Sequence, residues 1–265
     1  MHLHSAAAAA GYRLLNYATV ASTNAEALGL ARRGERGPLW ITAQQQTAGR
    51  GRRGNAWSSP SGNLYATLLL HDPAPAEHAP ELSFVTALAL HDAVGECAPA
   101  LRHALTLKWP NDLLLGGAKV AGILIESERV DEKLTVVIGI GVNCEHHPAD
   151  TPYPATNLAL ADANISAETL FAALSGTMVE RLTQWHRGSG FAAVRADWVA
   201  RAAGFGVDMR VRLPDRELLG RGETLDDQGR LLLRLADGSV QAIAAGEVFP
   251  LAAAVSREPP TGRHT

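Results

Sequence analysis

The sequence predicts a mixed α/β protein made of a larger domain, in which helices flank a mixed sheet, and a small β-barrel near the C-terminus. Two observations support this prediction. Up to residue 203, apolar runs of strand length alternate with segments whose apolar residues recur at helical spacing. Beyond that point the helical spacing stops, and short strand-like runs are separated by turn-forming residues.

The larger domain is predicted to extend from residue 12 to residue 204. Six apolar or β-branched runs are expected to be its strands: residues 39–43, 64–70, 105–109, 113–115, 120–126 and 134–140. Four segments are expected to be helices: residues 25–31, 80–97, 170–185 and 192–203. The first helix has both a start and a stop signal, because Ser22 or Thr23 can cap free backbone N–H groups and Gly34 suits its end.

The barrel is predicted to extend from residue 205 to residue 252. Its strands are expected at residues 207–213, 217–225, 230–235 and 239–243. Asp237-Gly238 lies between two of these strands and is a tight-hairpin signal. The tail at residues 253–265 contains Pro259-Pro260 and is expected to be disordered.

Composition argues against several classes of function. The 265 residues are 46% hydrophobic and 19% charged with a formal net charge of -3, whereas a protein that grips nucleic acid usually carries a positive excess. No apolar run approaches the ~20 residues of a membrane span, and the start does not resemble a signal peptide. The 2 cysteines fit a reduced compartment. We therefore expect a cytoplasmic protein that binds neither nucleic acid nor membranes.

A loop rich in glycine and arginine, GRGRRG at residues 49–54, follows the first predicted strand. Its glycines allow backbone N–H groups to point at a ligand. Arg50 and Arg52 supply rigid, permanently charged donors for a carboxylate or phosphate. The alternative interpretation of this segment alone is a flexible solvated turn or a nucleic-acid contact.

A second motif, KWPND at residues 108–112, ends a predicted buried strand. A lysine that the following Trp-Pro holds at a strand end can meet a developing negative charge. The alternative is an ordinary surface lysine that pairs with Asp112.

Two glycines interrupt a third apolar run, GIGVNC at residues 139–144. Glycines within a strand let a flat ligand or another backbone approach closely, and Asn143 could then contact a nucleotide base. A bulge with a turn-forming asparagine is the alternative. The next residues include His146 and His147, but adjacent histidines point in different directions, so we predict no metal site there.

In this order, the motifs resemble those of biotin protein ligases. The matching residues are Ser22-Thr23-Asn24, Gln46, the GRGRRG loop with Trp57, KWPND, Lys119-Val-Ala-Gly-Ile-Leu124 and GIGVNC. The resemblance covers roughly residues 12–250 and implies that the barrel is SH3-like. It departs at Asn55, where many relatives carry a basic residue. About twenty residues precede Ser22, too few for the helix-turn-helix domain of some relatives, so the monofunctional type is expected. The protein is expected to be a monomer or a homodimer.

The resemblance implies a reaction and a set of site residues. Biotin protein ligases activate biotin with ATP and Mg²⁺ to biotinyl-5′-AMP, and pass the biotinyl group to one lysine of a biotin carboxyl carrier protein. By resemblance, the biotin-binding residues are Ser22, Thr23, Asn24, Gln46, Arg50, Gly51, Arg52 and Lys108. The ATP-binding residues are Arg52, Trp57, Lys108, Asn111, Lys119 and Asn143. Lys108 and Arg52 are the expected catalytic residues.

Two other functions compete with this one. Lipoate and octanoate protein ligases share the general architecture and reaction type, but the GRGRRG loop together with KWPND favours biotin. A nucleic-acid-binding module is disfavoured by the net charge and by the lack of aromatic residues among the arginines.

Overall fold

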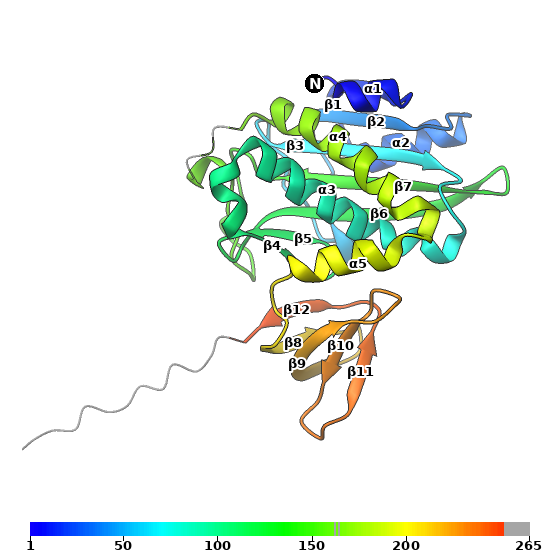
Figure 1. The fold of residues 1–265 in the computed structure, drawn as a ribbon. Coiled ribbons are helices and arrows are strands. Elements are labelled where there is room, and N and C mark those ends of the chain that lie inside the picture. The colour runs from blue at the N-terminus through cyan, green and yellow to red at the C-terminus, as the bar shows by residue number, and fades with distance from the viewer. Residues whose placement is uncertain (162, 164, 252–265) are drawn as a thin grey trace, which may run out of the picture.

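Seven runs of the chain pair into one mixed sheet in the computed structural model, which describes residues 1–161, 163 and 165–251 (Figure 1). The strand order is β1-β2-β3-β7-β6-β5-β4. The strands are β1 (Arg13–Val20), β2 (Leu39–Gln46), β3 (Leu64–His71), β4 (Leu105–Lys108), β5 (Asp112–Leu115), β6 (Ala118–Val130) and β7 (Lys133–Val142). β1 and β2 are parallel, and the other neighbouring strands are antiparallel.

Helices cover both faces of this sheet. They are α1 (Ser5–Ala9), α2 (Thr23–Arg32), α3 (Leu82–Cys97), α4 (Ala167–Trp185) and α5 (Phe191–Ala200). α3, α4 and α5 cross the near face in Figure 1, whereas α2 packs on the opposite face. Leu68 and Leu70 of β3 therefore join the large core, and Leu69 between them joins a smaller core under α2. Burial on both faces explains why the central strands are continuous apolar runs.

The C-terminal unit is an antiparallel sheet of five strands in the order β11-β10-β9-β8-β12, which forms the predicted small barrel. Its strands are β8 (Asp208–Arg212), β9 (Glu217–Leu225), β10 (Leu231–Arg234), β11 (Val240–Ile243) and β12 (Glu247–Pro250). It follows α5 and lies beyond the β4 side of the first sheet in Figure 1. The predicted tail at residues 253–265 lies outside the described residues.

The predicted strands and helices are present, with ends that differ by a few residues, but three of the α-helices and strands in the described residues were not predicted. α1 forms from the alanine-rich start, which the sequence does not distinguish from a low-complexity segment. β1 is mostly exposed on both faces, so it lacks the alternation that marks a strand, and it forms by pairing with β2. β12 is a short run that pairs with β8. In the described part of the chain, no helix is both long and apolar enough to cross a membrane.

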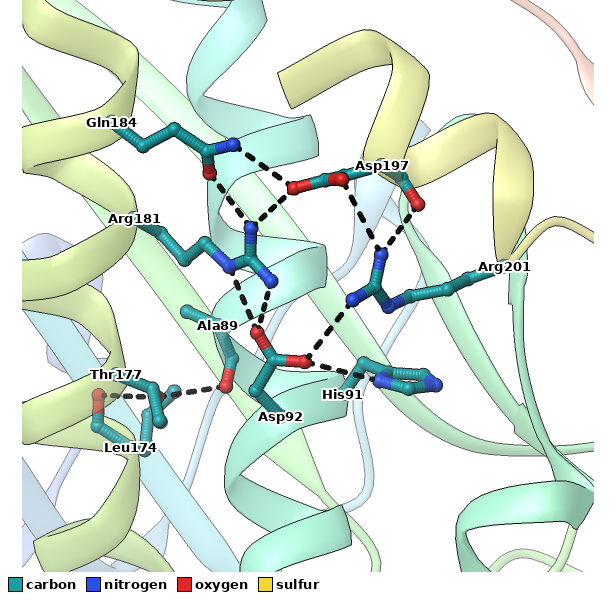
Figure 2. Close-up of polar contacts among 9 residues, drawn as sticks. All are labelled: Ala89, His91, Asp92, Leu174, Thr177, Arg181, Gln184, Asp197 and Arg201. Atoms are coloured by element: carbon teal, nitrogen blue, oxygen red, sulfur yellow. Dashed lines mark hydrogen bonds and ion pairs between the residues drawn. The ribbon is translucent and has the colours of Figure 1, made fainter. Parts of the chain in front are cut away.

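A charged network joins the three helices on the near face of the sheet (Figure 2). Arg181 of α4 lies at its centre, with Nε 2.8 Å from an oxygen of Asp92 on α3. The Nη1 atom of the same guanidinium is 2.7 Å from Asp197 on α5. Arg201, at the end of α5, donates to the Asp197 carbonyl oxygen at 2.8 Å and lies 3.9 Å from Asp92. The network therefore fixes the last turn of α5 against α3 and α4.

Both carboxylates of the network have pKa values below their ordinary range. Burial raises the pKa of Asp92, but hydrogen bonds from His91 and Arg181 and the nearby positive charges outweigh it. The pKa of Asp197 is lowered first by the Gln184 hydrogen bond and further by Arg181 and Arg201. The ionised carboxylates therefore contribute stability that is present above the ordinary carboxyl pKa of about 3.9 and is lost as the pH falls through the lowered values.

We predict that Arg181→Met destabilises the fold by about 2 kcal/mol at pH 7, because it leaves Asp92 and Asp197 poorly compensated. This is below the ~3–5 kcal/mol of a fully buried pair, since both carboxylates keep some solvent contact. The loss should shrink as the carboxylates become protonated below about pH 4. Urea denaturation at pH 7 and pH 3.5 measures it. The control is Arg32→Met, because the Arg32 side chain that pairs with Glu128 is 64% exposed. An equal effect of both variants at pH 7 would contradict the prediction.

Candidate active site

The register of the first sheet places a row of residues across the face that α2 covers. Lys108 of β4 is paired with Asp112 of β5, Asp112 with Gly122 of β6, and Gly122 with Gly141 of β7. In antiparallel strands, paired residues point to the same face. Two charged side chains therefore lie beside two residues that have no side chain. The result is a hollow with charge along one edge.

The glycines of β7 are required by what lies against them. A Cβ atom on Gly139 would be 2.4 Å from the side-chain oxygen of Asn24, and one on Gly141 would be 2.6 Å from the indole nitrogen of Trp57. The glycines were predicted to let another group approach this strand closely, and in the structure the side chains of Asn24 and Trp57 do so. The hollow continues into a cavity of about 450 Å³, within the usual range of a small-molecule site.

One end of the cavity presents neutral hydrogen-bonding groups. Ser22 caps α2 by accepting from Ala25 N, which places Thr23 and Asn24 in the first turn of that helix. The Thr23 amide and hydroxyl donate to the side-chain oxygen of Gln46 at 2.9 and 3.1 Å. Asn24 donates to Glu126 at 2.8 Å and accepts from Thr67 at 2.7 Å. This buried set suits a small polar group that carries both donors and acceptors.

The other end is charged. The ammonium of Lys119 is 2.7 Å from one oxygen of Asp112, and that of Lys108 is 3.6 Å from the other oxygen. The three side chains are only 11–15% exposed. Burial lowers the pKa of Lys108, and the Asp112 charge opposes this shift. One carboxylate is therefore shared between two lysines, and the excess positive charge favours an anionic ligand.

Aromatic rings surround the two ammonium groups. Lys108 lies 5.7 Å from the ring centres of both Tyr153 and Phe249, and Lys119 lies 5.2 Å from Tyr153 and 5.5 Å from Trp57. A cation within about 6 Å of a ring is attracted by the ring quadrupole. The rings thus stabilise the lysines and provide flat surfaces beside them.

The glycine-arginine loop joins the two sheets over the cavity. Gly51 N donates to Asn55 O at 2.7 Å, and Trp57 N donates to Gly49 O at 2.9 Å, which folds the loop back on itself. Arg52 donates to Asn111 of the KWPND motif and to the Gly246 carbonyl before β12, both at 3.3 Å. Burial lowers the pKa of Arg52, although the charge of Asp112 opposes the shift.

The structure brings together eleven of the twelve predicted site residues. The residues that line the cavity are Ser22, Thr23, Asn24, Gln46, Arg50, Gly51, Arg52, Trp57, Lys108, Asn111 and Lys119. Asn143 lies apart from them: it is 3% exposed, and its amide donates to the Thr156 carbonyl at 3.0 Å. Its predicted contact with a nucleotide base stays a prediction.

Sequence reasoning missed several cavity residues. Tyr153 belongs to the loop that follows β7, and Arg212 and Phe249 belong to the barrel. The Arg212 guanidinium stacks 5.1 Å from the Phe249 ring centre. Glu126 of β6 lies outside the cavity lining and supports it by accepting a hydrogen bond from Asn24 at 2.8 Å. Nothing local distinguishes Arg212 from the other arginines of the barrel strands.

Comparisons with known proteins agree with this geometry. Residues 19–143 match the biotin/lipoate A/B protein ligase family, and residues 205–249 match the biotin protein ligase C-terminal domain. Biotin--[acetyl-CoA-carboxylase] ligase of Paracoccus denitrificans is 44% identical over 238 residues, 86% of this chain and 96% of that protein. The Mycobacterium tuberculosis ligase of the same name is 34% identical, over 92% of this chain and 91% of that protein.

A solved structure shows the same fold. Biotin protein ligase from Aquifex aeolicus, in complex with biotin and ATP, superposes with a TM-score of 0.75 at 24% identity, over 89% of this chain and 97% of that chain. The family match over residues 19–143 thus defines a protein of the biotin/lipoate ligase class, and the fold agrees with it. The sequence relatives and the C-terminal match narrow this class, and the chain belongs to the biotin protein ligase family.

We predict that Asp112→Asn lowers the pKa of Lys108 further, because it removes the negative charge that opposes the effect of burial. The rate at which acetic anhydride labels Lys108, followed by mass spectrometry against pH, reports this pKa without an activity assay. Asp131→Asn is the control, since Asp131 is 73% exposed and pairs with Arg36 at the surface. An unchanged or higher Lys108 pKa in Asp112→Asn would show that Asp112 does not stabilise the ammonium.

Proposed function

We propose that the protein activates biotin with ATP and transfers the biotinyl group to a lysine of a biotin carboxyl carrier protein in the cytoplasm. One observation supports this most strongly: a neutral hydrogen-bonding end and a cationic end lie in one cavity, side by side across β5, β6 and β7. Biotin has a neutral ureido ring at one end and a carboxylate at the other. The cavity offers matching groups at the two ends.

The first half of the proposed reaction forms a mixed anhydride. A biotin carboxylate oxygen attacks the α-phosphorus of ATP, the bond to the bridging oxygen breaks, and pyrophosphate leaves with the electron pair. Mg²⁺, which would accompany ATP, would neutralise part of the phosphate charge. Negative charge accumulates around the α-phosphate in the transition state. We assign Lys108 and Arg52 to this charge, since their buried cationic groups flank Asn111 and Asp112.

The second half transfers the acyl group. The carrier lysine, as the neutral amine, attacks the carbonyl carbon of biotinyl-5′-AMP, the bond to the phosphate oxygen breaks, AMP leaves with the electron pair, and the surplus proton of the amine passes to solvent. The same cations stabilise the departing phosphate. Arg52 has a further role in this proposal. Its contacts with Asn111 and Gly246 hold its side chain across the cavity, where it would keep water from the anhydride.

Roles for the remaining predicted residues follow from their positions. Ser22, Thr23, Asn24 and Gln46 would hold the ureido ring, and Arg50 and Gly51 would close over biotin. Trp57, Asn111 and Lys119 would contact ATP, together with Asn143 if its amide turns from Thr156. We also propose residues 12–204 as the catalytic domain and residues 205–252 as the barrel that completes its wall.

The neutral end of the cavity argues against octanoate or lipoate as the substrate. An alkyl chain has no group to pair with Thr23, Asn24 or Gln46 as they lie in the first turn of α2 and the end of β2. A cavity end lined by polar groups favours a ligand that can hydrogen-bond with them over an alkyl chain that cannot. A nucleic-acid role is also disfavoured, because Arg50 and Arg53 face Glu126 and Glu247 of the chain itself.

The direct test of the proposed function uses the protein, biotin, MgATP and a purified biotin carboxyl carrier domain. Mass spectrometry of the carrier should show one biotinylated lysine, and omission of ATP should abolish it. Octanoate and lipoate in place of biotin should give no product. Acylation of the carrier by octanoate, or the absence of any acylation, would refute the assignment.

We predict that Lys108→Ala lowers the rate of adenylate formation by about 10²- to 10³-fold with the fold intact, the usual effect of losing one fixed donor to a transition-state charge. Biotin-dependent pyrophosphate release measures the rate, and circular dichroism checks the fold. Lys133→Ala is the control, because Lys133 is 57% exposed and pairs with Asp72 at the surface. A rate within threefold of wild type for Lys108→Ala would remove this residue from the mechanism.

We predict that Arg52→Ala weakens retention of the adenylate more than it weakens binding of biotin. The variant should release biotinyl-5′-AMP, which then labels lysines of a bystander protein such as serum albumin. Streptavidin blotting of the bystander measures this release. Arg129→Ala serves as the control, since its guanidinium bonds only the Glu132 carbonyl among the described contacts. Equal bystander labelling by Arg52→Ala and wild type would assign retention to the loop backbone.

A further inference from the structure

The residues on both sides of Lys108 are hydrogen-bonded to the C-terminal part of the chain. Leu107 N donates to Arg201 O at 2.9 Å, and Ala203 N donates to Leu107 O at 2.8 Å. On the other side, the indole nitrogen of Trp109 donates to Gly229 O, in the β9–β10 turn of the barrel, at 3.1 Å. β4 is an edge strand of the first sheet, so these bonds replace the strand neighbour that it lacks on this side.

The β9–β10 turn fits tightly into an aromatic socket. Gly229 has a φ of +75°, and a Cβ atom there would lie 2.8 Å from the Phe84 ring and 3.2 Å from the Phe191 ring. Trp198 packs edge-on against Phe84, with ring centres 5.4 Å apart. Only glycine satisfies both the backbone conformation and the space. The position of the Gly229 carbonyl, and with it the bond to Trp109, is therefore closely defined.

The turn is also rigid in itself. The Asp226 carboxylate accepts from the backbone N–H groups of Gln228 and Arg230, both at 2.9 Å. Arg195 of α5 donates to Leu225 O at 3.1 Å and lies 2.9 Å from Asp227. Hydrogen bonds within the turn and to α5 fix its conformation, so the turn can hold Trp109 in place.

The hydrogen bonds between Leu107 and residues 201–203 are held in place by the charged network of Figure 2. Arg201 supplies the carbonyl that Leu107 binds, and its own side chain contacts Asp197 and Asp92. Arg181 joins the same two carboxylates to α4. The carbonyl that orients β4 therefore belongs to the end of α5, which α3 and α4 hold in place.

We propose that Trp109 and the linker at residues 201–203 are positioning elements for Lys108, through which the C-terminal barrel sets the place of the ammonium in the active site. The inference rests on the proposed function. A long lysine side chain reaches a defined point only when the backbone that carries it is fixed, and a displacement of about 1 Å in an active site can lower the rate by 10²-fold. Trp109 is a positioning residue that acts through its neighbour.

The experiment replaces the indole while an aromatic ring is kept. Trp109→Phe removes the N–H that binds Gly229 O. We expect kcat for biotin-dependent pyrophosphate release to fall about tenfold or more, while the KM for biotin stays within twofold, because the neutral end of the cavity lies on α2 and β2. Acetic anhydride should label Lys108 faster than in wild type, because the side chain gains access to solvent.

Trp198→Phe is the matched control. Trp198 is 1% exposed and belongs to the same aromatic cluster, but its indole nitrogen has no hydrogen-bond partner among the described residues. It should leave kcat and Lys108 labelling unchanged when the rates are corrected for the folded fraction. Gly229→Ala, which forces a methyl group against Phe84, should reproduce the kcat loss of Trp109→Phe.

Three results would overturn the inference: kcat within twofold of wild type in Trp109→Phe, an equal loss in Trp198→Phe, or a matching rise in the biotin KM. The proposed function fails separately, if wild type itself forms no adenylate. Lys108 labelling then decides the inference alone, and equal labelling of wild type and Trp109→Phe would reject it.

Discussion

The site depends on one carboxylate, Asp112, placed between two buried ammonium groups. Burial of a cation is costly, and a shared counter-charge offsets part of this cost for Lys108 and Lys119. One negative charge cannot neutralise two positive ones, so the cavity keeps an electrostatic preference for an anion. The rings of Tyr153, Phe249 and Trp57 stabilise the lysines without adding charge. The proposed binding of a carboxylate and a phosphate follows from this imbalance.

The sheet register places this excess positive charge at one end of the cavity. Because Lys108, Asp112, Gly122 and Gly141 are paired in one row, the charges lie directly beside the space that the glycines leave. The start of α2 then supplies neutral groups from the same face. The barrel closes the charged end of the cavity. The hydrogen bonds from residues 201–203 and Gly229 to the neighbours of Lys108 also fix the backbone on both sides of this lysine.

The sequence predicts the parts of this arrangement that have local signals. KWPND, the glycine-arginine loop and the capped start of α2 are each visible in a few consecutive residues, and the structure brings them to one cavity. The roles of β1 and β12 depend on pairing with distant strands, so no local pattern marks them. Arg212 and Phe249 reach the cavity only because the barrel docks there. Asn143 bonds the Thr156 carbonyl in the structure, so its predicted contact with a base stays a prediction.

In the proposed reaction, the cavity joins a carboxylate to the α-phosphate of ATP before any carrier protein is present. Exchange of labelled pyrophosphate into ATP, measured with wild-type protein and no carrier, tests this most directly. We expect rapid exchange that requires biotin and does not occur with octanoate or lipoate. Exchange supported by octanoate, or no exchange with biotin at saturating ATP, would contradict it.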